Sequence, residues 1–347
     1  MIIGWNLGVL CENIAYGTAV LYSLKKHWNE ETKKPHRINE ILYAILFYTF
    51  GIASLFLFEK DNLSYKTENM FYFFLFLTYI SLDLFWWIFN LIPNIIQCKK
   101  NIEERKRRDY SEFVRSINET QAGSNLKGDI TRKLLHLIMF LIIVFLFVIN
   151  KANKANIELR FENYWSFTKF LYTLISYSFV FMFTLADLVR HNMFYALPNW
   201  ARKWYKTSVA PREAYTFISS IPYVLTLSLF QFAPYQILFI ASGVSTFADA
   251  AASIIGKRFG KHKFPEKLDK KKSFEGLFAG IAFGFLTPVT ILYIFPFGNQ
   301  NDLFILLVGG GCALIFACTD LFIKNIADNI TNVLFPGILI LLLQNFI

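Results

Sequence analysis

Residues 243–276, "GVSTFADAAASIIGKRFGKHKFPEKLDKKKSFEG", place one acid inside an apolar stretch and a strongly basic loop directly after it. Asp249 has small neighbours, which would let a second helix or a ligand approach it closely. A carboxylate in an apolar segment is energetically costly and therefore indicates a functional site. Lys257 and Arg258 begin the basic loop. Cations bind phosphate oxygens, and a carboxylate can bind Mg²⁺ or accept a hydroxyl proton, so the pattern suits phosphoryl transfer.

The end of the same loop, "KKKSFEG", is a second candidate phosphate site. Ser273 is placed to cap a following helix, whose free N–H groups and positive dipole end attract anions. Lys271 and Lys272 precede this cap, and Glu275 and Gly276 fall in the first helical turn. A lysine beside a membrane span is also an ordinary orientation signal, so each lysine taken singly has a structural alternative.

Four further clusters place charged residues at or near the ends of apolar stretches. They are Arg132, Lys133 and His136 in "TRKLLH", Asp187, Arg190 and His191 in "ADLVRHN", Arg212 and Glu213 in "APRE", and Asp320, Asp328 and Asn329 in "TDLFIKNIADN". Structural alternatives exist here too, because long cationic side chains can extend to the interface and a single histidine can simply be packed. Asp187 and His191 stand four residues apart but lack a third ligand for a metal.

Familiar nucleotide-binding motifs are missing from the chain. The stretch "GKRFGKHK" lacks the spacing of a GxxxxGK[ST] loop, and no GxGxxG follows a strand-like segment. Cys11, Cys98, Cys312 and Cys318 show neither CxxC nor zinc-site spacing and are expected to be packing residues. A nucleotide site in this chain is therefore not of the P-loop or Rossmann type.

The clusters, taken in order, resemble the CTP-dependent lipid-alcohol kinases, which include dolichol kinase, phytol kinase and CTP-using diacylglycerol kinases. The resemblance covers about residues 131–337. Its elements are R-K-x-x-H (Arg132, Lys133, His136), D-x-x-R (Asp187, Arg190), R-E (Arg212, Glu213), D-x-x-A-S-x-x-G-x-x-x-G-K (Asp249, Ala252, Ser253, Gly256, Gly260, Lys261), K-S-x-E-G (Lys272, Ser273, Glu275, Gly276) and D-N…P (Asp328, Asn329, Pro336). Ala248 stands where the family commonly has glycine, and Asp320 where a glutamate is common.

The resemblance implies CTP as phosphoryl donor, Mg²⁺ as cofactor and a membrane lipid alcohol (dolichol or another polyprenol, phytol or diacylglycerol) as acceptor. It implies a catalytic group of Asp249, Arg132, Lys133 and Asp187. Nucleotide contacts are expected from Lys257, Arg258, Lys271, Lys272, Ser273, Glu275, Gly276 and Arg212, and metal contacts from Asp249, Asp328 and Asn329. His136, Arg190, Glu213 and Asp320 are further candidates. Asp249 is expected to be either a metal ligand or the base that deprotonates the lipid hydroxyl.

Two other functions are compatible with charged membrane segments. Phosphatidate cytidylyltransferase also joins CTP to a membrane lipid, but its GHGG-containing pattern does not occur in this sequence. A transporter of an anionic lipid or metabolite would use charged spans and basic loops as well. Against transport stand the grouping of charges at one side and the lack of an evident inverted repeat.

The elements that must position these residues are membrane-spanning helices. The 347 residues are 55% hydrophobic and 18% aromatic, which predicts an all-α, polytopic membrane bundle. A span needs about 20 mainly apolar residues. About ten stretches qualify, with the first and last the weakest: 3–24, 38–58, 70–97, 134–150, 166–188, 214–230, 235–255, 274–297, 303–322 and 332–347.

Most of the 35 lysines and arginines fall in alternate loops, which places those loops and the charged clusters in the cytoplasm and both termini opposite. The net charge of +10 is thereby explained without a nucleic-acid partner. We expect the endoplasmic reticulum membrane in a eukaryote and the cytoplasmic membrane in a prokaryote. Residues 1–97 are predicted to form three N-terminal spans, 98–130 a basic cytoplasmic linker, and 131–347 the catalytic domain with spans four to ten.

Overall fold

The computed structural model describes residues 4–122, 125–209, 211–265, 272–298, 300–323 and 325–344. The side chains of residues 60, 120–122, 125–129, 131, 132 and 212 lie outside this description. The chain divides into two compact units. Unit 1 is Met1–Gly128 with Phe145–Leu225, and unit 2 is Asp129–Val144 with Thr226–Ile347. This division differs from the boundary expected at residue 131.

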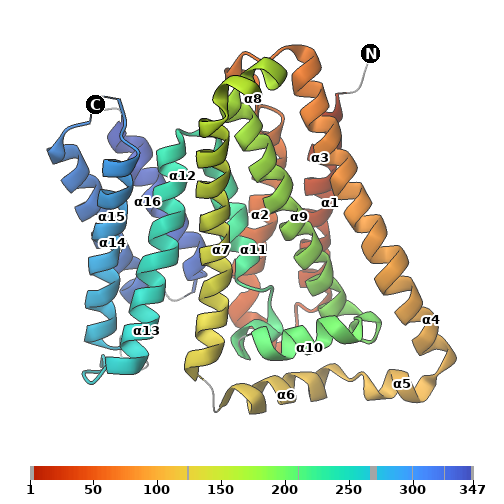
Figure 1. Cartoon of the computed structure of the whole chain (residues 1–347). Helices are drawn as coiled ribbons and strands as arrows, with labels where there is room; N and C mark the ends of the chain where they lie inside the picture. Colours follow the sequence, from red (N-terminus) through yellow and green to blue (C-terminus); the bar gives the residue numbers. More distant parts are fainter. Residues whose placement is uncertain are drawn as a thin grey trace. The chain divides into compact units, whose positions relative to one another are not determined.

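Unit 1 is built from helices (Figure 1). Those that lie wholly within it are α1 (Trp5–Lys26), η1 (Glu31–His36), α2 (Arg37–Ser54), η2 (Glu59–Asp61), α3 (Tyr65–Phe85), the π-helical turn η3 (Trp86–Leu91), α4 (Ile92–Lys100), α5 (Ile102–Arg107), α6 (Tyr110–Ala122), α8 (Lys154–Phe161), α9 (Tyr164–Asn192), η4 (Phe194–Ala196), α10 (Asn199–Ser208) and η5 (Pro211–Tyr215). Helices α7 (Asn125–Ala152) and α11 (Ser220–Ser228) contribute residues to both units.

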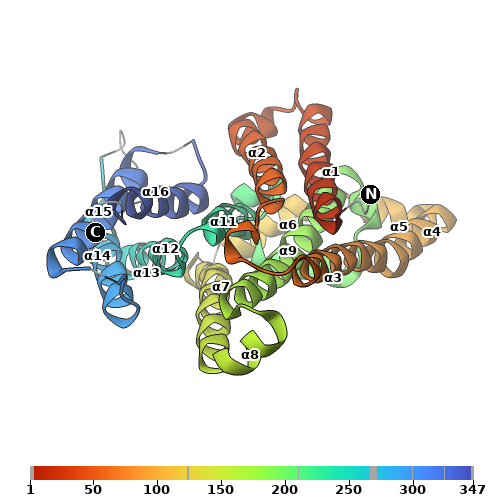
Figure 2. The same cartoon turned by 90° about the horizontal axis from the view of Figure 1, so that it is seen from above.

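Unit 2 contains the C-terminal helices, in which α14 packs against α13 and α15, and α16 packs against α12 and α15 (Figures 1 and 2). Its elements are η6 (Leu229–Phe232), α12 (Tyr235–Gly243), the π-helical turn η7 (Val244–Ala248), α13 (Asp249–Phe259), α14 (Phe274–Ile294), α15 (Asp302–Phe322) and α16 (Asp328–Leu343). The described residues form no β-strand, only one β-bridge between Lys263 and Ser273.

Seven helices in the described part of the chain are long and apolar enough to cross a membrane. They are Trp5–Lys26, Tyr65–Lys100, Lys133–Ala152, Tyr164–Asn192, Tyr235–Phe259, Phe274–Ile294 and Asp302–Phe322. The all-α membrane class is therefore supported, whereas the expected count of about ten is not confirmed. The expected spans at 214–230 and 332–347 correspond to the shorter apolar helices Ser220–Phe232 and Asp328–Leu343, and 38–58 corresponds to the 18-residue α2.

Stacked aromatic rings fill the core of unit 1. The ring of Tyr16 in α1 lies 4.5 Å from that of Phe181 in α9, and Phe50 in α2 lies 4.0 Å from Tyr177, measured between centroids. All four side chains are buried. Offset stacking adds about 0.5–1.5 kcal/mol to the burial of such rings. The aromatic richness of the sequence is therefore used in helix packing.

The segment expected to be a basic linker forms helices α5 and α6. In α6, Phe113, Val114 and Ile117 are buried, which gives this helix one apolar face. Helix α6 packs against α10 and η5 within unit 1. The linker is thus a structured part of unit 1, since its apolar residues recur at helical spacing.

Candidate functional site

An ion pair in unit 2 joins two of the predicted clusters. The ammonium group of Lys133 in α7 donates a hydrogen bond to Oδ2 of Asp249, the first residue of α13. Both side chains are partly buried, with 19% and 15% of their surfaces exposed. Reduced contact with water strengthens such a pair relative to a surface pair. The structure therefore places an acid and a cation together at a position that solvent still reaches.

Asp249 directly follows the π-helical turn η7 within one long helix, Tyr235–Phe259. Such π-turns insert a residue into an α-helix and occur frequently at functional sites. Phe247 of this turn packs edge-on against Phe140 of α7, with ring centroids 5.1 Å apart. Lys133 and Phe140 are seven residues apart and so share a face of α7. This aromatic contact holds the two helices in the register that brings Lys133 to Asp249.

His136 lies on the same face of α7 and is buried at 3% exposure. Both Lys133 and Asp328 lie within electrostatic range of its ring. Asp328 is the first residue of α16, and its Oδ1 accepts a hydrogen bond from the backbone N–H of Asn329 at 3.0 Å. Asn329 itself is 4% exposed. The R-K-x-x-H, D-x-x-A-S and D-N elements are therefore neighbours in unit 2. The side chain of Arg132 is outside the described set.

A second ion pair lies at the start of α14. Lys272 Nζ donates to Asp320 Oδ1 at 2.8 Å and also to the backbone carbonyl of Asp320. Asp320 lies in the last turn of α15, where free carbonyl groups favour a nearby cation. Ser273 caps α14 by accepting a hydrogen bond from Gly276 N at 3.2 Å. The predicted cap is thus confirmed, whereas Lys271 lies outside the described residues.

Glu275 connects the described residues 262–264 of the preceding loop to the start of α14. Its carboxylate accepts hydrogen bonds from the backbone N–H of His262 at 3.1 Å, and it pairs with Nδ1 of the same residue at 2.7 Å. Backbone bonds from Phe264 to Lys272 and from Phe274 to His262 continue this fold. In the described structure Glu275 therefore positions the loop. Lys257 and Arg258 are exposed in the last turn of α13, and Arg258 lies 5.3 Å from the ring of Phe259.

Gly276 permits a close contact between two helix backbones. A Cβ added to Gly276 would lie 2.7 Å from the carbonyl oxygen of Ala252 and 2.9 Å from Cα of Gly256. Such distances are too short for any side chain. One helical turn further along α14, a Cβ on Gly280 would lie 3.1 Å from the Ala252 side chain. Gly276 and Gly280 therefore allow α13 and α14 to pack closely.

The D-x-x-R element lies in unit 1 and is completely buried. Asp187 Oδ1 accepts a hydrogen bond from Arg190 Nε at 2.9 Å, and Oδ2 accepts one from the backbone N–H of Ile218 at 2.8 Å. Arg190 also donates to the carbonyl oxygens of Glu213 and Ala214 at 3.1 Å and of Thr216 at 2.6 Å. These bonds fasten the loop that contains η5 to the end of α9.

The same loop holds the R-E element. Glu213 is 5% exposed and its Oε1 accepts a hydrogen bond from the backbone N–H of Ser219 at 3.2 Å. The side chain of Arg212 is among those not described. The described hydrogen bonds of Asp187, Arg190 and Glu213 connect the end of α9 with the loop of residues 213–219. The predicted clusters are therefore divided between the two units.

Several residues in these networks were not singled out from the sequence. The guanidinium carbon of Arg190 lies 4.8 Å from the ring centre of Tyr205, and the hydroxyl of Tyr110 donates to the carbonyl oxygen of Ala214. Burial raises the pKa of Tyr110 to about 12, so this hydroxyl stays protonated as a donor. In unit 2, Thr319 Oγ1 donates to Asn332 Oδ1 at 2.7 Å. Asn332 follows Asn329 by three residues, a spacing that indicates a shared helix face.

Comparison with protein-family models, curated proteins and solved structures gives no match to this chain. Among the residues that the structure describes, no group of three or more His, Cys, Asp or Glu side chains is arranged to hold a metal ion.

Proposed function

We propose that this protein is a CTP-dependent kinase that transfers the γ-phosphoryl group to the hydroxyl of a membrane lipid alcohol. The observation that carries the proposal is the pairing of Lys133 with Asp249, which brings together two motifs that resemble those of lipid-alcohol kinases. The seven apolar helices are compatible with an integral membrane enzyme that meets its acceptor in the bilayer.

Cations of unit 2 would bind the triphosphate. Lys133 is partly exposed beside Asp249, and Lys272 lies beside the capped start of α14. Positioning and charge neutralisation account for most of the catalysis of phosphoryl transfer. Lys257 and Arg258 add positive charge at the end of α13. Lys271 and Arg132 are proposed as further phosphate ligands from their sequence positions.

The donor set fits Mg²⁺ carried with the nucleotide. Mg²⁺ is usually held by one or two carboxylates together with substrate phosphates and water, so a dedicated cluster of three acids is not required. Asp249 would hold the ion, with Asp328 and Asn329 as further oxygen donors. When bound, the ion neutralises charge on the phosphate oxygens.

In the proposed reaction the lipid hydroxyl oxygen forms a bond to the γ-phosphorus. The bond from that phosphorus to the bridging β,γ-oxygen breaks, and CDP leaves with the bonding electrons. The hydroxyl proton passes to a base, for which Asp249 is the candidate if it does not bind the metal. Whether Asp249 binds the metal or accepts the proton, Lys133 beside it would stabilise negative charge on the phosphate oxygens.

The test is transfer of labelled γ-phosphate from CTP by the purified full-length protein in detergent with Mg²⁺. Polyprenol, phytol and diacylglycerol serve as acceptors, and ATP is run in parallel. We expect phosphorylation of one alcohol with CTP. Release of pyrophosphate with a cytidylylated lipid, when phosphatidate is added, would instead indicate a cytidylyltransferase. No transfer to any acceptor would contradict the proposal and favour transport.

A further inference from the structure

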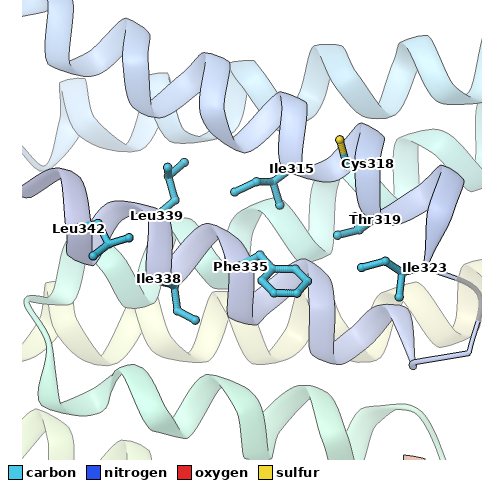
Figure 3. A pocket seen from close by; sticks show the side chains of 8 residues that line it. All are labelled: Ile315, Cys318, Thr319, Ile323, Phe335, Ile338, Leu339 and Leu342. Carbon is cyan, nitrogen blue, oxygen red and sulfur yellow. The ribbon is translucent and has the colours of Figure 1, made fainter.

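An apolar groove runs between α15 and α16 in unit 2, with a volume of about 320 Å³ (Figure 3). Its lining includes Ile315, Thr319 and Ile323 on one side and Phe335, Leu339 and Leu342 on the other. Figure 3 shows Ile323 and Leu342 at opposite ends of the groove. The volume lies at the lower end of the range of about 300–1,000 Å³ for small-molecule sites, which suits a single chain segment.

A glycine in α15 makes room beside this groove. A Cβ added to Gly311 would lie 2.5 Å from Cδ2 of Leu339, the tip of a side chain that lines the groove. Gly311, Ile315 and Thr319 follow one another at four-residue spacing and share a face of α15. Leu339 therefore rests in the space that the absent side chain leaves. A larger residue at position 311 would push it into the groove.

One end of the groove lies in the same turn of α15 as a charged pair. Thr319 lines the groove, and the next residue, Asp320, pairs with Lys272 at 2.8 Å. Ile323 follows the end of α15 at the same end. The other lining residues extend along α15, a candidate membrane span, and along α16. A ligand that matches this arrangement has a long hydrocarbon chain with a polar group at one end.

We propose that the groove between α15 and α16 binds the hydrocarbon chain of the acceptor alcohol and directs its hydroxyl toward the end marked by Thr319 and Asp320. This inference rests on the proposed kinase function and adds a location for the acceptor. The choice of occupant follows from the apolar lining, the membrane-spanning length of α15 and the Asp320–Lys272 pair in the same helical turn as Thr319. A single-chain alcohol fits the groove volume better than a lipid with two chains.

A binding experiment tests the groove separately from catalysis. Full-length protein in nanodiscs is exposed to a farnesol analogue that carries a diazirine on its chain, without nucleotide, and the labelled residues are mapped by mass spectrometry. Labels are expected on α15 and α16 residues that line the groove. Leu339→Trp fills the groove and should reduce this labelling about tenfold. A tenfold loss of affinity corresponds to the loss of about two buried methylene groups from an apolar site.

Leu314→Trp is the matched control, because Leu314 lies on α15 but is 65% exposed and does not line the groove. It should leave the labelling unchanged, and Gly311→Ala should reduce it more mildly than Leu339→Trp. Labels elsewhere in the chain, or equal labelling of Leu339→Trp and Leu314→Trp, would overturn the inference.

Kinetic measurements distinguish failure of the groove inference from failure of the kinase proposal. Leu339→Trp should raise the KM for farnesol with little change in kcat, and should leave the KM for a short water-soluble alcohol unchanged. Phosphoryl transfer with an unaltered farnesol KM would reject the groove and keep the kinase. Labelling of the groove without any phosphoryl transfer would reject the kinase and keep the groove as a lipid site.

Discussion

Lys133 and Asp249 are 116 residues apart in the sequence, yet their side chains form an ion pair in unit 2. The pair depends on packing between α7 and the π-helical turn before α13, where Phe140 contacts Phe247. It leaves both groups partly accessible, unlike the Asp187–Arg190 pair of unit 1, whose side chains are fully buried. Access to solvent distinguishes a candidate reactive pair from a structural one.

The cap of α14 should matter for nucleotide binding as well as for stability. Ser273→Ala removes the hydrogen bond to Gly276 N and should cost about 1 kcal/mol of unfolding free energy. Asn301→Ala removes the equivalent cap of α15, which Asn301 makes to Phe304 N. We expect similar losses of thermal stability but a higher KM for CTP only in Ser273→Ala. An equal KM in the two variants would argue against a phosphate site at this helix end.

Gly276→Ala should destabilise unit 2, because the added methyl group would collide with backbone atoms of Ala252 and Gly256. Overpacking of this kind costs about 1–3 kcal/mol. Gly310→Ala is the control, since nothing lies within 4 Å of a Cβ at that position. It should be neutral or stabilise α15 by up to about 1 kcal/mol. Thermal unfolding in detergent measures both, and equal melting temperatures would contradict the close contact.

The Asp187–Arg190 pair is expected to act through folding. Arg190→Gln leaves a buried carboxylate without its cation and should cost about 3–5 kcal/mol. Arg115→Gln, which breaks an exposed pair with Glu119, should cost less than about 1 kcal/mol. The yield of folded protein and the activity per folded molecule are measured together. A well-folded Arg190→Gln protein without activity would instead indicate contact with substrate.

Glu162 should make the stability of unit 1 sensitive to acid. Its carboxylate accepts hydrogen bonds from Ser64 and Thr67, and those from Ser64 are the main reason that the pKa of Glu162 is lowered from 4.5. A lowered folded-state pKa contributes stability above the unfolded value, and this contribution is lost as the pH falls through the folded value.

Glu162→Gln tests this directly through melting temperatures measured at pH values above and below 4.5. The wild type should be more stable than the variant at neutral pH, and the difference should shrink as the pH falls below 4.5. A difference that does not change with pH would show that the charge of Glu162 is not responsible. Glu158→Gln provides a control, because Glu158 belongs to an exposed pair on α8.

Much of the fold could be predicted from hydropathy alone, because apolar stretches of sufficient length form helices. Hydropathy could not locate the helix ends. The stretch expected at 214–230 begins with η5, and the helix starts only at Ser220, since Glu213 and Ser219 are engaged in the loop structure. The stretch expected at 332–347 corresponds to a 16-residue helix that begins at Asp328. For this reason the expected count of about ten spans is not confirmed among the described residues.

The site was predictable where the signal is local. Ser273 stands just before an apolar helix, and its capping role follows from neighbouring residues. The pairing of Lys133 with Asp249 depends on tertiary packing and could not be deduced from their spacing. The same holds for Arg190, because its partners are backbone carbonyls of residues 213–216. Every residue has a backbone carbonyl, so the sequence does not indicate which of them will accept a hydrogen bond. The π-turn before Asp249 likewise depends on packing around α12 and α13.

The most direct test of the kinase account compares Asp249→Asn with the wild type for transfer of labelled γ-phosphate from CTP to the preferred alcohol. Asp302→Asn serves as the control, because Asp302 is an exposed acid in the first turn of α15. At equal amounts of folded protein, Asp249→Asn should lose about 10²–10⁴-fold in rate while Asp302→Asn keeps wild-type activity. Transfer by Asp249→Asn at a rate equal to that of the wild type would contradict the assignment of Asp249 and the mechanism built on it.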